Sequence, residues 1–531
     1  MLDYTSYLSE QAKLVVPDGI RGLFPLEKPG VVSFLAGKPN PATFPFESVT
    51  LHLKPPLGID AGDAEYVKTL EGQTDQEDRA ISVDDKGQIV LELEGKDMQE
   101  ALQYGPTAGI PRLVTFLTEF ISTVHERPIP SAAGAAGAAV KPKTNGTASP
   151  LSRPDTPHHP TKAQAAQLTK ELNGTARGEP TTETVNDTTG SPASSNGNGL
   201  AGPSTTAAAA QTPWRVTVGG GCQDLLFKAF QTLLNPGDAI LVESPVYAGV
   251  LGQFLYLGLE KIDVAVDDQG LSAKALRDVL ESWPEGKKKP RVLYTVPTGS
   301  NPTGASSGAE RKLDVLRLAH EHDLLIIEDD PYYFLASERP QSYFELETQV
   351  VPGGGRVIRF DSLSKVLSSG MRLGFATGPT PIIKAMDVYT SAANLQPNGM
   401  SQAIAYRLLR HWGIKGFQEH SQRVAQFYAK RRNQFEAIAK RHLEGIATWV
   451  SPVAGMFLWI DVSPLPDTYD LVMNNALARG VLAIPGFAFM PNGGKTSFVR
   501  ASFSIVDMHD AEQGFKALGE AIREMRAELG L

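Results

Sequence analysis

One lysine of the chain, Lys365, lies among residues that could bind a phosphorylated ligand. Ser362 and Ser364 precede it and Arg372 follows it, and the flanking segments "GGRVIRF" and "RLGFATG" predict buried strands. Hydroxyl and guanidinium groups are good donors to phosphate, and a lysine amine can form a Schiff base with an aldehyde. Because a lysine on a protein surface is ordinary, its role depends on what else the fold brings near it.

The 531-residue chain has the composition of a globular protein, with 41% hydrophobic and 21% charged residues. Its formal net charge of -9 argues against a large nucleic-acid or anionic-membrane surface, since both attract an excess of Lys and Arg. The single cysteine, Cys222, excludes an intramolecular disulfide and fits a reducing compartment. The sequence contains no visible signal peptide, membrane span or zinc pattern, so we expect a cytoplasmic protein without a bound metal.

Composition and periodicity divide the chain into five ranges. Residues 130–212 contain no Phe, Tyr, Trp, Ile or Met, so we expect a disordered insertion there, because such a segment cannot bury enough apolar area to offset its ordering entropy. The predicted ranges are an N-terminal arm with part of a small domain (1–60), the start of a large domain (61–129), the insertion (130–212), the main part of the large domain (213–395) and a small C-terminal domain (396–531).

After the insertion, short apolar segments alternate with helical patterns. This alternation predicts an α/β fold with a mainly parallel sheet covered by helices on both faces. The predicted strands are "WRVTVG", "AILVESP", "RVLYTVP", "LLIIEDD", "GRVIRF" and "RLGFATG". The C-terminal segments "GMFLWIDV", "VLAIPG" and "SFVRASFSI" with a final helix predict a smaller α+β unit.

Polar residues follow several of these strands directly. Asn301 comes after "RVLYTVP", Asp329 ends "LLIIEDD" and Tyr332 follows it. A glycine-rich turn with Cys222 and Gln223 opens a helix after "WRVTVG", and a helix N-terminus favours an anion. Ligands bind at the carboxyl ends of strands in such sheets. An anion site, an acid, an amide and an amine at one edge together suit pyridoxal phosphate held on a lysine.

Several motifs resemble a known family. "YTVPTGSNPTG", "IIEDDPYYFL", "DSLSKVLSSGMRLGF" and "FVRASFS", in this order, are similar to the class I/II aminotransferases of pyridoxal phosphate fold type I. "FLAGKPNPATFPF", "ALQYGPTAGIPRL" and "VESPVYAG" resemble their aromatic and 2-aminoadipate aminotransferase branch, which includes kynurenine and fungal aromatic aminotransferases. The resemblance covers nearly the whole chain except the insertion. It implies a homodimer that transfers the amino group of aromatic L-amino acids, 2-aminoadipate or kynurenine to a 2-oxo acid such as 2-oxoglutarate.

The resemblance also assigns roles to the matching residues. Lys365 would hold the cofactor as a Schiff base and move the substrate proton. Asp329, rather than Asp330, would pair with the pyridine nitrogen, because the family spacing is Asp-x-x-Tyr. Further cofactor contacts are implied for Tyr332, Asn301, Tyr247, Cys222, Gln223, Ser362, Ser364, Arg372 and, from the neighbouring subunit, Tyr104.

The implied substrate site has three residues. Arg500 would bind the α-carboxylate of the amino acid, because a planar guanidinium group can make two parallel hydrogen bonds with it. Gly37 and Arg21 match positions that line the substrate pocket in the aromatic and 2-aminoadipate branch.

Three other functions compete with transamination. Another reaction of the same cofactor, such as a C–S lyase or decarboxylase reaction, remains open because substrate geometry decides which bond breaks. A regulator with an aminotransferase-like domain would need a winged helix-turn-helix before "FLAGKPNP", where only a short arm is present. The "GASSG" segment matches a hydrolase motif but lacks the strand before it, and Ser307 with Glu310 instead predicts a capping box.

Overall fold

The computed structural model of the chain describes residues 2–14, 48–60, 63, 66, 82–84, 88–130 and 212–531. Gly37 and Arg21 lie outside the described residues, and so does the predicted insertion apart from its two end residues.

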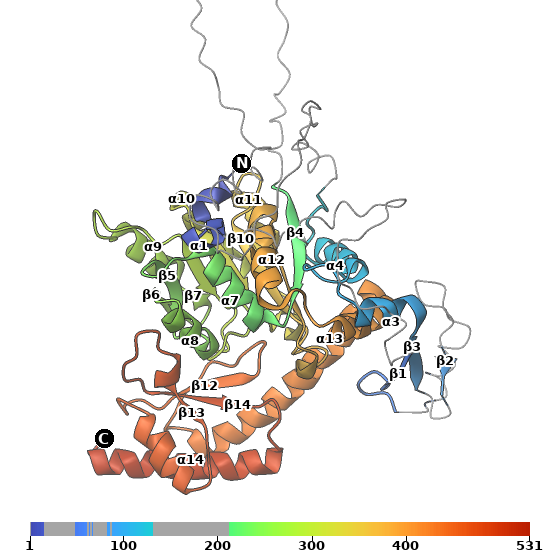
Figure 1. Ribbon diagram of the computed structural model, residues 1–531. Coiled ribbons are helices and arrows are strands. Elements are labelled where there is room, and N and C mark those ends of the chain that lie inside the picture. Colours follow the sequence, from blue (N-terminus) through green and yellow to red (C-terminus); the bar gives the residue numbers. More distant parts are fainter. Residues whose placement is uncertain are drawn as a thin grey trace, which may run out of the picture. The chain divides into compact units, whose positions relative to one another are not determined.

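An eight-stranded sheet forms the centre of the larger lobe (Figure 1). Its strand order is β4-β11-β10-β9-β8-β5-β6-β7, and the neighbours from β10 to β6 are parallel. In this sheet, β11 and β7 run in the opposite direction to the other strands. The predicted mainly parallel sheet is therefore confirmed. The strands are β4 (Trp214–Gly219), β5 (Ala239–Ser244), β6 (Glu260–Asp267), β7 (Gly270–Leu271), β8 (Val292–Thr295), β9 (Leu325–Asp329), β10 (Val357–Ser362) and β11 (Gly374–Pro379).

Burial explains which of these strands the sequence revealed. Every residue of β8, β9 and β10 is buried, because helices cover both faces of the sheet, and such strands appear as continuous apolar segments. The sequence did not reveal β6, which lies near the edge of the sheet. Its segment "EKIDVAVD" exposes Glu260, Asp263 and Asp267, so no continuous apolar segment marks it.

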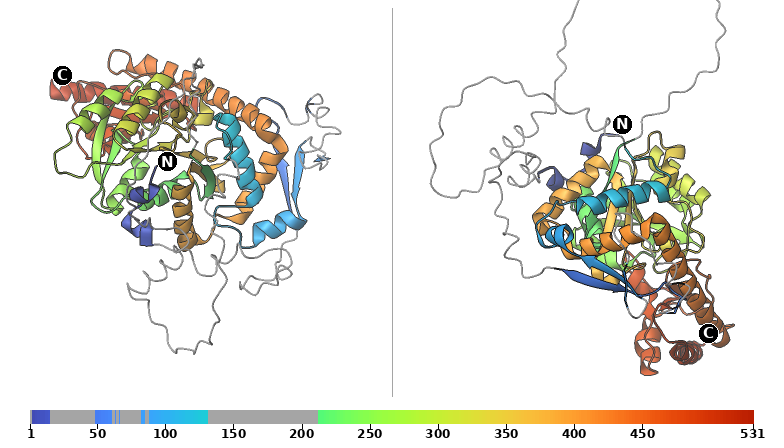
Figure 2. Two further views of the ribbon diagram at one scale, coloured as in Figure 1. Left: turned by 90° about the horizontal axis from the view of Figure 1, so that it is seen from above. Right: turned by 90° about the vertical axis from the view of Figure 1, so that its right-hand side faces the viewer.

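Helices pack on the two faces of this sheet in separate hydrophobic clusters. The helices on one face are α7 (Cys222–Leu233), α8 (Ala248–Tyr256) and α12 (Thr380–Asn394), with the short α1 (Glu10–Leu14) packed on α7. The helices on the other face are α4 (Pro111–Val124), α9 (Ala273–Glu281), α10 (Ala309–Glu321), α11 (Tyr343–Val350) and the first part of α13 (Gly399–Leu443). In Figure 2, α4 and this part of α13 lie side by side.

The smaller lobe is built on the second part of α13. This long helix is broken at Gly413 (φ 62°, ψ -178°), and beyond the break it packs with α14 (Met508–Leu529). These two helices share a hydrophobic core with a sheet of β12 (Phe457–Asp461), β14 (Phe498–Ser502) and β13 (Ile484–Pro485), in that order.

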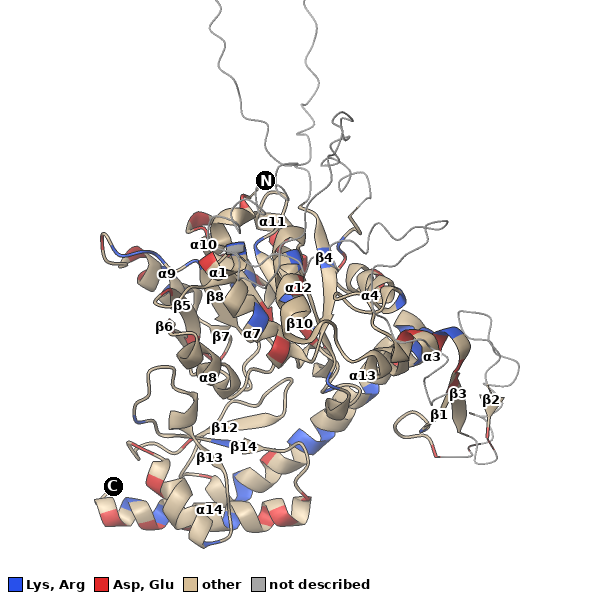
Figure 3. Ribbon diagram, viewed as in Figure 1, with Lys and Arg blue, Asp and Glu red and all other residues tan. Residues whose placement is uncertain are grey.

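Charged side chains also join the two helices of the smaller lobe. Lys and Arg are mixed with Asp and Glu along α14, whereas Lys and Arg predominate along the second part of α13 (Figure 3). Glu512 of α14 pairs with both Arg441 and His442 of α13.

A third sheet is formed by three strands that precede the insertion. It consists of β1 (Val49–Leu53), β3 (Ile89–Leu93) and β2 (Ser82–Val83), in that order, and α3 (Gly95–Leu102) follows it. Both β3 and α3 contact α13. The predicted domain boundary after residue 60 lies between β1 and β3, which pair with each other in this sheet. The domain boundaries stay predictions.

The remaining regular segments are short. They are the 3-10 helices η1 (Tyr4–Tyr7), η5 (Tyr333–Leu335), η6 (Ser369–Met371) and η8 (Gly486–Phe489), and the π-helix η7 (Leu471–Ala476). A search of the described ranges found no helix with the length and apolar character that a membrane crossing requires.

The predicted capping box of Ser307 and Glu310 is wrong. The helix α10 is preceded by Gly308, and no side chain caps it. The Ser307 hydroxyl instead donates to the carbonyl oxygen of Gln269, 2.8 Å away, so it ties the loop before α10 to the turn between β6 and β7.

A cluster of buried charges lies where β9 and β10 pair. The Arg359 guanidinium is fully buried and lies 3.1 Å from carboxylate oxygens of both Glu328 and Asp330. It also donates to Asp361 over 2.8 Å. Buried carboxylates are costly unless they are paired, so this one arginine stabilises three of them.

Replacement of Arg359 by Met should strongly destabilise the protein. The side chain volume is largely kept, but three buried carboxylates lose their cation, which should cost about 3–5 kcal/mol of the free energy of unfolding. Urea denaturation followed by far-UV circular dichroism measures this loss. The matched control is Arg277→Met, since Arg277 forms a solvent-exposed pair with Glu281 and should contribute less than about 1 kcal/mol. Equal losses in both variants would contradict the account.

Candidate functional site

A cavity of about 340 Å³ lies at the carboxyl ends of β9 and β10, next to the N-terminus of α7. Its lining includes every residue predicted to contact the cofactor ring or phosphate except Tyr104. The lining residues are Cys222, Gln223, Leu226, Tyr247, Val296, Asn301, Asp329, Pro331, Tyr332, Ser362, Ser364, Lys365, Ser369, Arg372 and Phe457. The structure therefore brings together side chains from six separate stretches of the sequence.

Lys365 lies in the turn that follows β10, and its side chain is half-buried. In the described part of the chain, its amine has no hydrogen-bond or ion-pair partner. Burial lowers the pKa of this amine, and the positive charge of Arg372 lowers it further. An unpaired amine that loses its proton more easily is a better nucleophile.

Asp329 is the last residue of β9 and is almost fully buried. Its Oδ2 accepts a hydrogen bond from the hydroxyl of Tyr294 over 2.7 Å. Its Oδ1 is buried and has no partner among the described residues. Burial raises the pKa of this carboxyl to about 7. The free oxygen can accept a hydrogen bond from a ring N–H, and a cationic ring would hold the carboxyl in its charged form.

The neighbouring Asp330 is placed differently. Its Oδ2 lies 3.1 Å from the Arg359 guanidinium and accepts a hydrogen bond from Thr298 over 3.2 Å. It does not line the cavity. The geometry therefore favours Asp329 over Asp330 as the acid of the site.

The N-terminus of α7 forms the anion-binding side of the cavity. Backbone N–H groups in the first turn of a helix lack intrahelical partners, and the helix dipole favours negative charge there. Cys222 and Gln223 begin this helix. Beside this N-terminus, the Arg372 guanidinium lies 3.4 Å from the Ser364 hydroxyl and 3.3 Å from the carbonyl oxygen of Gly220.

Two glycines allow the backbone to come this close. Gly221 has φ +94°, and a Cβ there would lie 2.7 Å from Nη2 of Arg372. A Cβ on Gly374 would lie 2.9 Å from the backbone nitrogen of Cys222. Burial raises the pKa of the Cys222 thiol, so this side chain stays neutral beside the helix N-terminus. The residues present therefore fit a phosphate group.

Arg500 comes from β14 of the smaller lobe and reaches the larger one. Its Nη1 donates to Oδ1 of Asn301 over 2.7 Å, and its guanidinium lies 4.2 Å from the ring centre of Phe457. Its Nε has no partner among the described residues. Burial lowers the pKa of Arg500, which keeps its positive charge at neutral pH. It can therefore attract a carboxylate.

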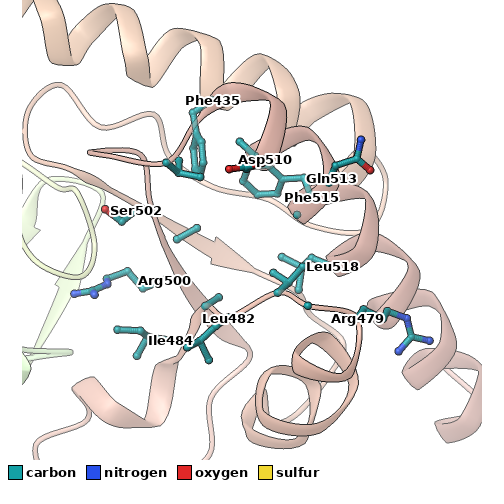
Figure 4. A pocket seen from close by; sticks show the side chains of 17 residues that line it. Phe435, Arg479, Leu482, Ile484, Arg500, Ser502, Asp510, Gln513, Phe515 and Leu518 are labelled. Atoms are coloured by element: carbon teal, nitrogen blue, oxygen red, sulfur yellow. The ribbon is translucent and has the colours of Figure 1, made fainter.

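A second cavity, of about 730 Å³, lies inside the smaller lobe beside α14. Figure 4 shows that the guanidinium of Arg500 points away from the apolar side chains of this cavity, such as Leu482 and Phe515. Arg500 lines this second cavity, but its guanidinium donates to Asn301, a residue that lines the first cavity.

Two tyrosines complete the first cavity. Tyr332 is almost fully buried, and its ring meets that of Phe457 edge to face with centroids 6.1 Å apart. The Tyr247 hydroxyl lies 3.3 Å from Oε1 of Gln223. Burial raises the pKa of both phenols, so both remain hydrogen-bond donors at neutral pH.

Tyr104 lies away from this cavity, and 52% of its surface is exposed. The sequence did not single out Phe457, Ser369 or Tyr294, although all three contribute to the site. Tyr294 had a visible signal, because it is the one hydroxyl-bearing aromatic residue in the apolar strand "RVLYTVP". Phe457 had none, since it begins an ordinary apolar strand.

Comparison with known proteins gives a consistent result. Residues 200–518 match the family model described as aminotransferase class I and II. Aminotransferase tdiD of Emericella nidulans is 33% identical over 97% of this chain and 95% of its own length. The mitochondrial kynurenine/alpha-aminoadipate aminotransferase of Mus musculus is 43% identical over 57% of this chain and 72% of its own.

The fold is similar to that of solved structures. The crystal structure of aminotransferase Aro8 from Candida albicans superposes with a TM-score of 0.72, covering 100% of this chain and 99% of that one, at 23% sequence identity. This similarity shows the same fold.

Replacement of Gly221 by Ala should weaken binding of pyridoxal phosphate, the cofactor that the sequence predicts. The added Cβ strains a left-handed backbone and displaces the guanidinium of Arg372, which together should cost about 1–3 kcal/mol. We therefore expect a Kd about ten- to a hundredfold higher in an absorbance titration of the apo-protein. Gly220→Ala is the matched control, because its Cβ would make only an ordinary 3.5 Å contact with Asp224. An unchanged Kd in Gly221→Ala would refute this phosphate site.

Proposed function

Because the chain belongs to the class I and II aminotransferases, whose cofactor is pyridoxal phosphate, we propose that it transfers the amino group of aromatic L-amino acids to a 2-oxo acid such as 2-oxoglutarate. When bound, the cofactor withdraws electrons from the Cα of the amino acid. One observation carries the site assignment. A carboxylate oxygen of Asp329 and the amine of Lys365, neither of which has a partner among the described residues, both line one cavity.

Lys365 is proposed to attach the cofactor and to move the proton at the substrate Cα. Its amine is half-buried and has a lowered pKa, so it gives up its proton more easily than an ordinary lysine. Asp329 would hold the proton on the ring nitrogen through its free Oδ1. Asn301 and Tyr332 would donate to the ring oxygen, and Tyr247 would lie against the ring face.

The phosphate is proposed to bind at the N-terminus of α7. The N–H groups of Cys222 and Gln223 would donate to it from one side. The hydroxyls of Ser362 and Ser364 and the guanidinium of Arg372 would donate from the other.

Arg500 is proposed to bind the α-carboxylate of the substrate. It already holds Asn301, so substrate binding and cofactor binding would share one hydrogen-bonded pair. Aromatic rings of Phe457 and Tyr332 meet beside it and offer apolar contacts to an aromatic side chain. Kynurenine and 2-aminoadipate, which the name of the mouse relative includes, are proposed as further donors.

We further propose that the enzyme is a homodimer. Tyr104 is exposed in the single chain, as we expect of a residue that reaches the site of a neighbouring subunit. Leu255 and Tyr256, at the end of the helix α8 that begins beside Tyr247, are 78% and 76% exposed, and such apolar residues are commonly covered by a partner. A cytoplasmic location stays a prediction, and the mouse relative is named as mitochondrial.

A panel of amino acids tests this function directly. Phenylalanine, tyrosine and tryptophan should convert the enzyme to its pyridoxamine form in stopped-flow absorbance, and each should yield the corresponding 2-oxo acid. Arg500→Lys should keep the cofactor but lower kcat/KM for every donor about ten- to a hundredfold, because a hydrogen-bonded contact to the charged carboxylate is worth about 1.5–3 kcal/mol.

Arg479→Lys is the matched control, since this arginine of the smaller lobe lines the second cavity and pairs with Glu524. Conversion by aspartate or alanine but not by aromatic donors would refute the substrate proposal. Release of carbon dioxide or of a thiol, with no 2-oxo acid formed by transfer of the amino group, would instead indicate a decarboxylase or C–S lyase.

A further inference from the structure

Tyr294 is a fully buried residue of β8 that touches the acid of the site. Its hydroxyl donates to Oδ2 of Asp329 over 2.7 Å. The strands β8 and β9 are parallel neighbours, so this bond joins them at the edge of the sheet where the cavity lies. Its ring packs edge-on against both Phe230 and Phe254, with centroids 5.8 and 6.2 Å away. These contacts fix where the hydroxyl points.

The hydrogen bond can run in only one direction when Asp329 is charged. A carboxylate is an acceptor only, so the phenol must donate. Burial raises the pKa of Tyr294 well above its usual value, and the negative charge of Asp329 raises it further. The phenol therefore keeps its proton at any physiological pH. Tyr294 therefore supplies a permanent donor to one oxygen of the acid.

Asp329 needs such a donor because its surroundings oppose its charge. Burial raises its pKa, and the charges of Asp330 and Asp361 raise it further, whereas the bond from Tyr294 lowers it. The charge of Arg359 lowers it as well, but that guanidinium already binds three other carboxylates. Tyr294 is thus the one described side chain that donates a hydrogen bond to Asp329.

We propose that Tyr294 is a positioning residue, whose hydroxyl turns one oxygen of Asp329 toward the ring nitrogen of the bound cofactor and keeps that carboxyl ionised. This inference rests on the role proposed above for Asp329. With Oδ2 occupied, only Oδ1 is left for the ring. The effect of Tyr294 on the reaction then acts through the protonation of the cofactor ring, without contact to the substrate.

The alternative is that Tyr294 only fills the core. Tyr294→Phe separates the two, because it keeps the ring packed against Phe230 and Phe254 and removes only the hydroxyl. Tyr343→Phe is a matched control, since Tyr343 is also fully buried in the larger lobe and its hydroxyl has no partner among the described residues.

The experiment uses the full-length protein, stripped of cofactor and reconstituted with pyridoxal phosphate labelled with ¹⁵N in the ring. In the wild type and in Tyr343→Phe, the ¹⁵N chemical shift at pH 7.5 should be that of a protonated ring nitrogen. In Tyr294→Phe it should move toward that of a neutral pyridine. The Kd for pyridoxal phosphate should rise about tenfold in Tyr294→Phe alone, as expected for loss of a hydrogen bond to a charged group.

Asp329→Asn distinguishes failure of this inference from failure of the proposed function. If Asp329→Asn binds pyridoxal phosphate as tightly as the wild type, the role proposed for Asp329 is wrong. If Asp329→Asn weakens binding and Tyr294→Phe changes neither the Kd nor the ¹⁵N shift, only the inference about Tyr294 is overturned. A Tyr294→Phe apo-protein that no longer folds, judged by far-UV circular dichroism, would also overturn it, because the hydroxyl would then serve the fold.

Discussion

The site depends on three consecutive acidic residues, 328 to 330, buried at the end of one strand. Side chains alternate along a strand, so Glu328 and Asp330 point to one face of the sheet and Asp329 to the other. Arg359, on the paired strand, binds Glu328 and Asp330. Among the described residues, Asp329 is left without a cation. Burial of an unpaired carboxylate is costly, and this cost is what a cationic ring nitrogen would remove. The fold thus stabilises two carboxylates itself and reserves the third for the cofactor.

The two lobes contribute separately to the same cavity. The larger lobe supplies the amine, the acid and the anion-binding helix, all at one edge of its sheet. The smaller lobe supplies Phe457 to the lining, and its Arg500 reaches across to Asn301. A cation from one lobe and an amide from the other therefore meet where the amino acid would bind. Movement of the smaller lobe would change the position of Arg500 and leave the cofactor contacts of the larger lobe in place.

Much of this arrangement could be predicted from the sequence, because buried parallel strands leave a strong apolar signal and polar residues follow them directly. Lys365 and the pair of Asp329 and Asp330 could be placed at these strand ends for this reason, and the family resemblance then selected Asp329 and gave Lys365 its role. The hydrogen bond between Arg500 and Asn301 was not, since it joins residues 199 positions apart in different lobes. Tyr294 was also missed, although it is the one hydroxyl-bearing aromatic residue of "RVLYTVP", because its partner Asp329 lies 35 positions away on the next strand. The capping box was predicted wrongly for the opposite reason. A local sequence motif suggested it, but the Ser307 hydroxyl instead forms a tertiary hydrogen bond with Gln269.

We propose that this chain holds pyridoxal phosphate covalently on Lys365, with Asp329 at the ring. Reduction of the purified enzyme with borohydride, followed by proteolysis and mass spectrometry, tests it most directly. The account predicts one phosphopyridoxyl-lysine, at position 365, in the peptide that contains "DSLSKVLSS". A label on any other lysine, or no label after incubation with excess pyridoxal phosphate, would contradict it.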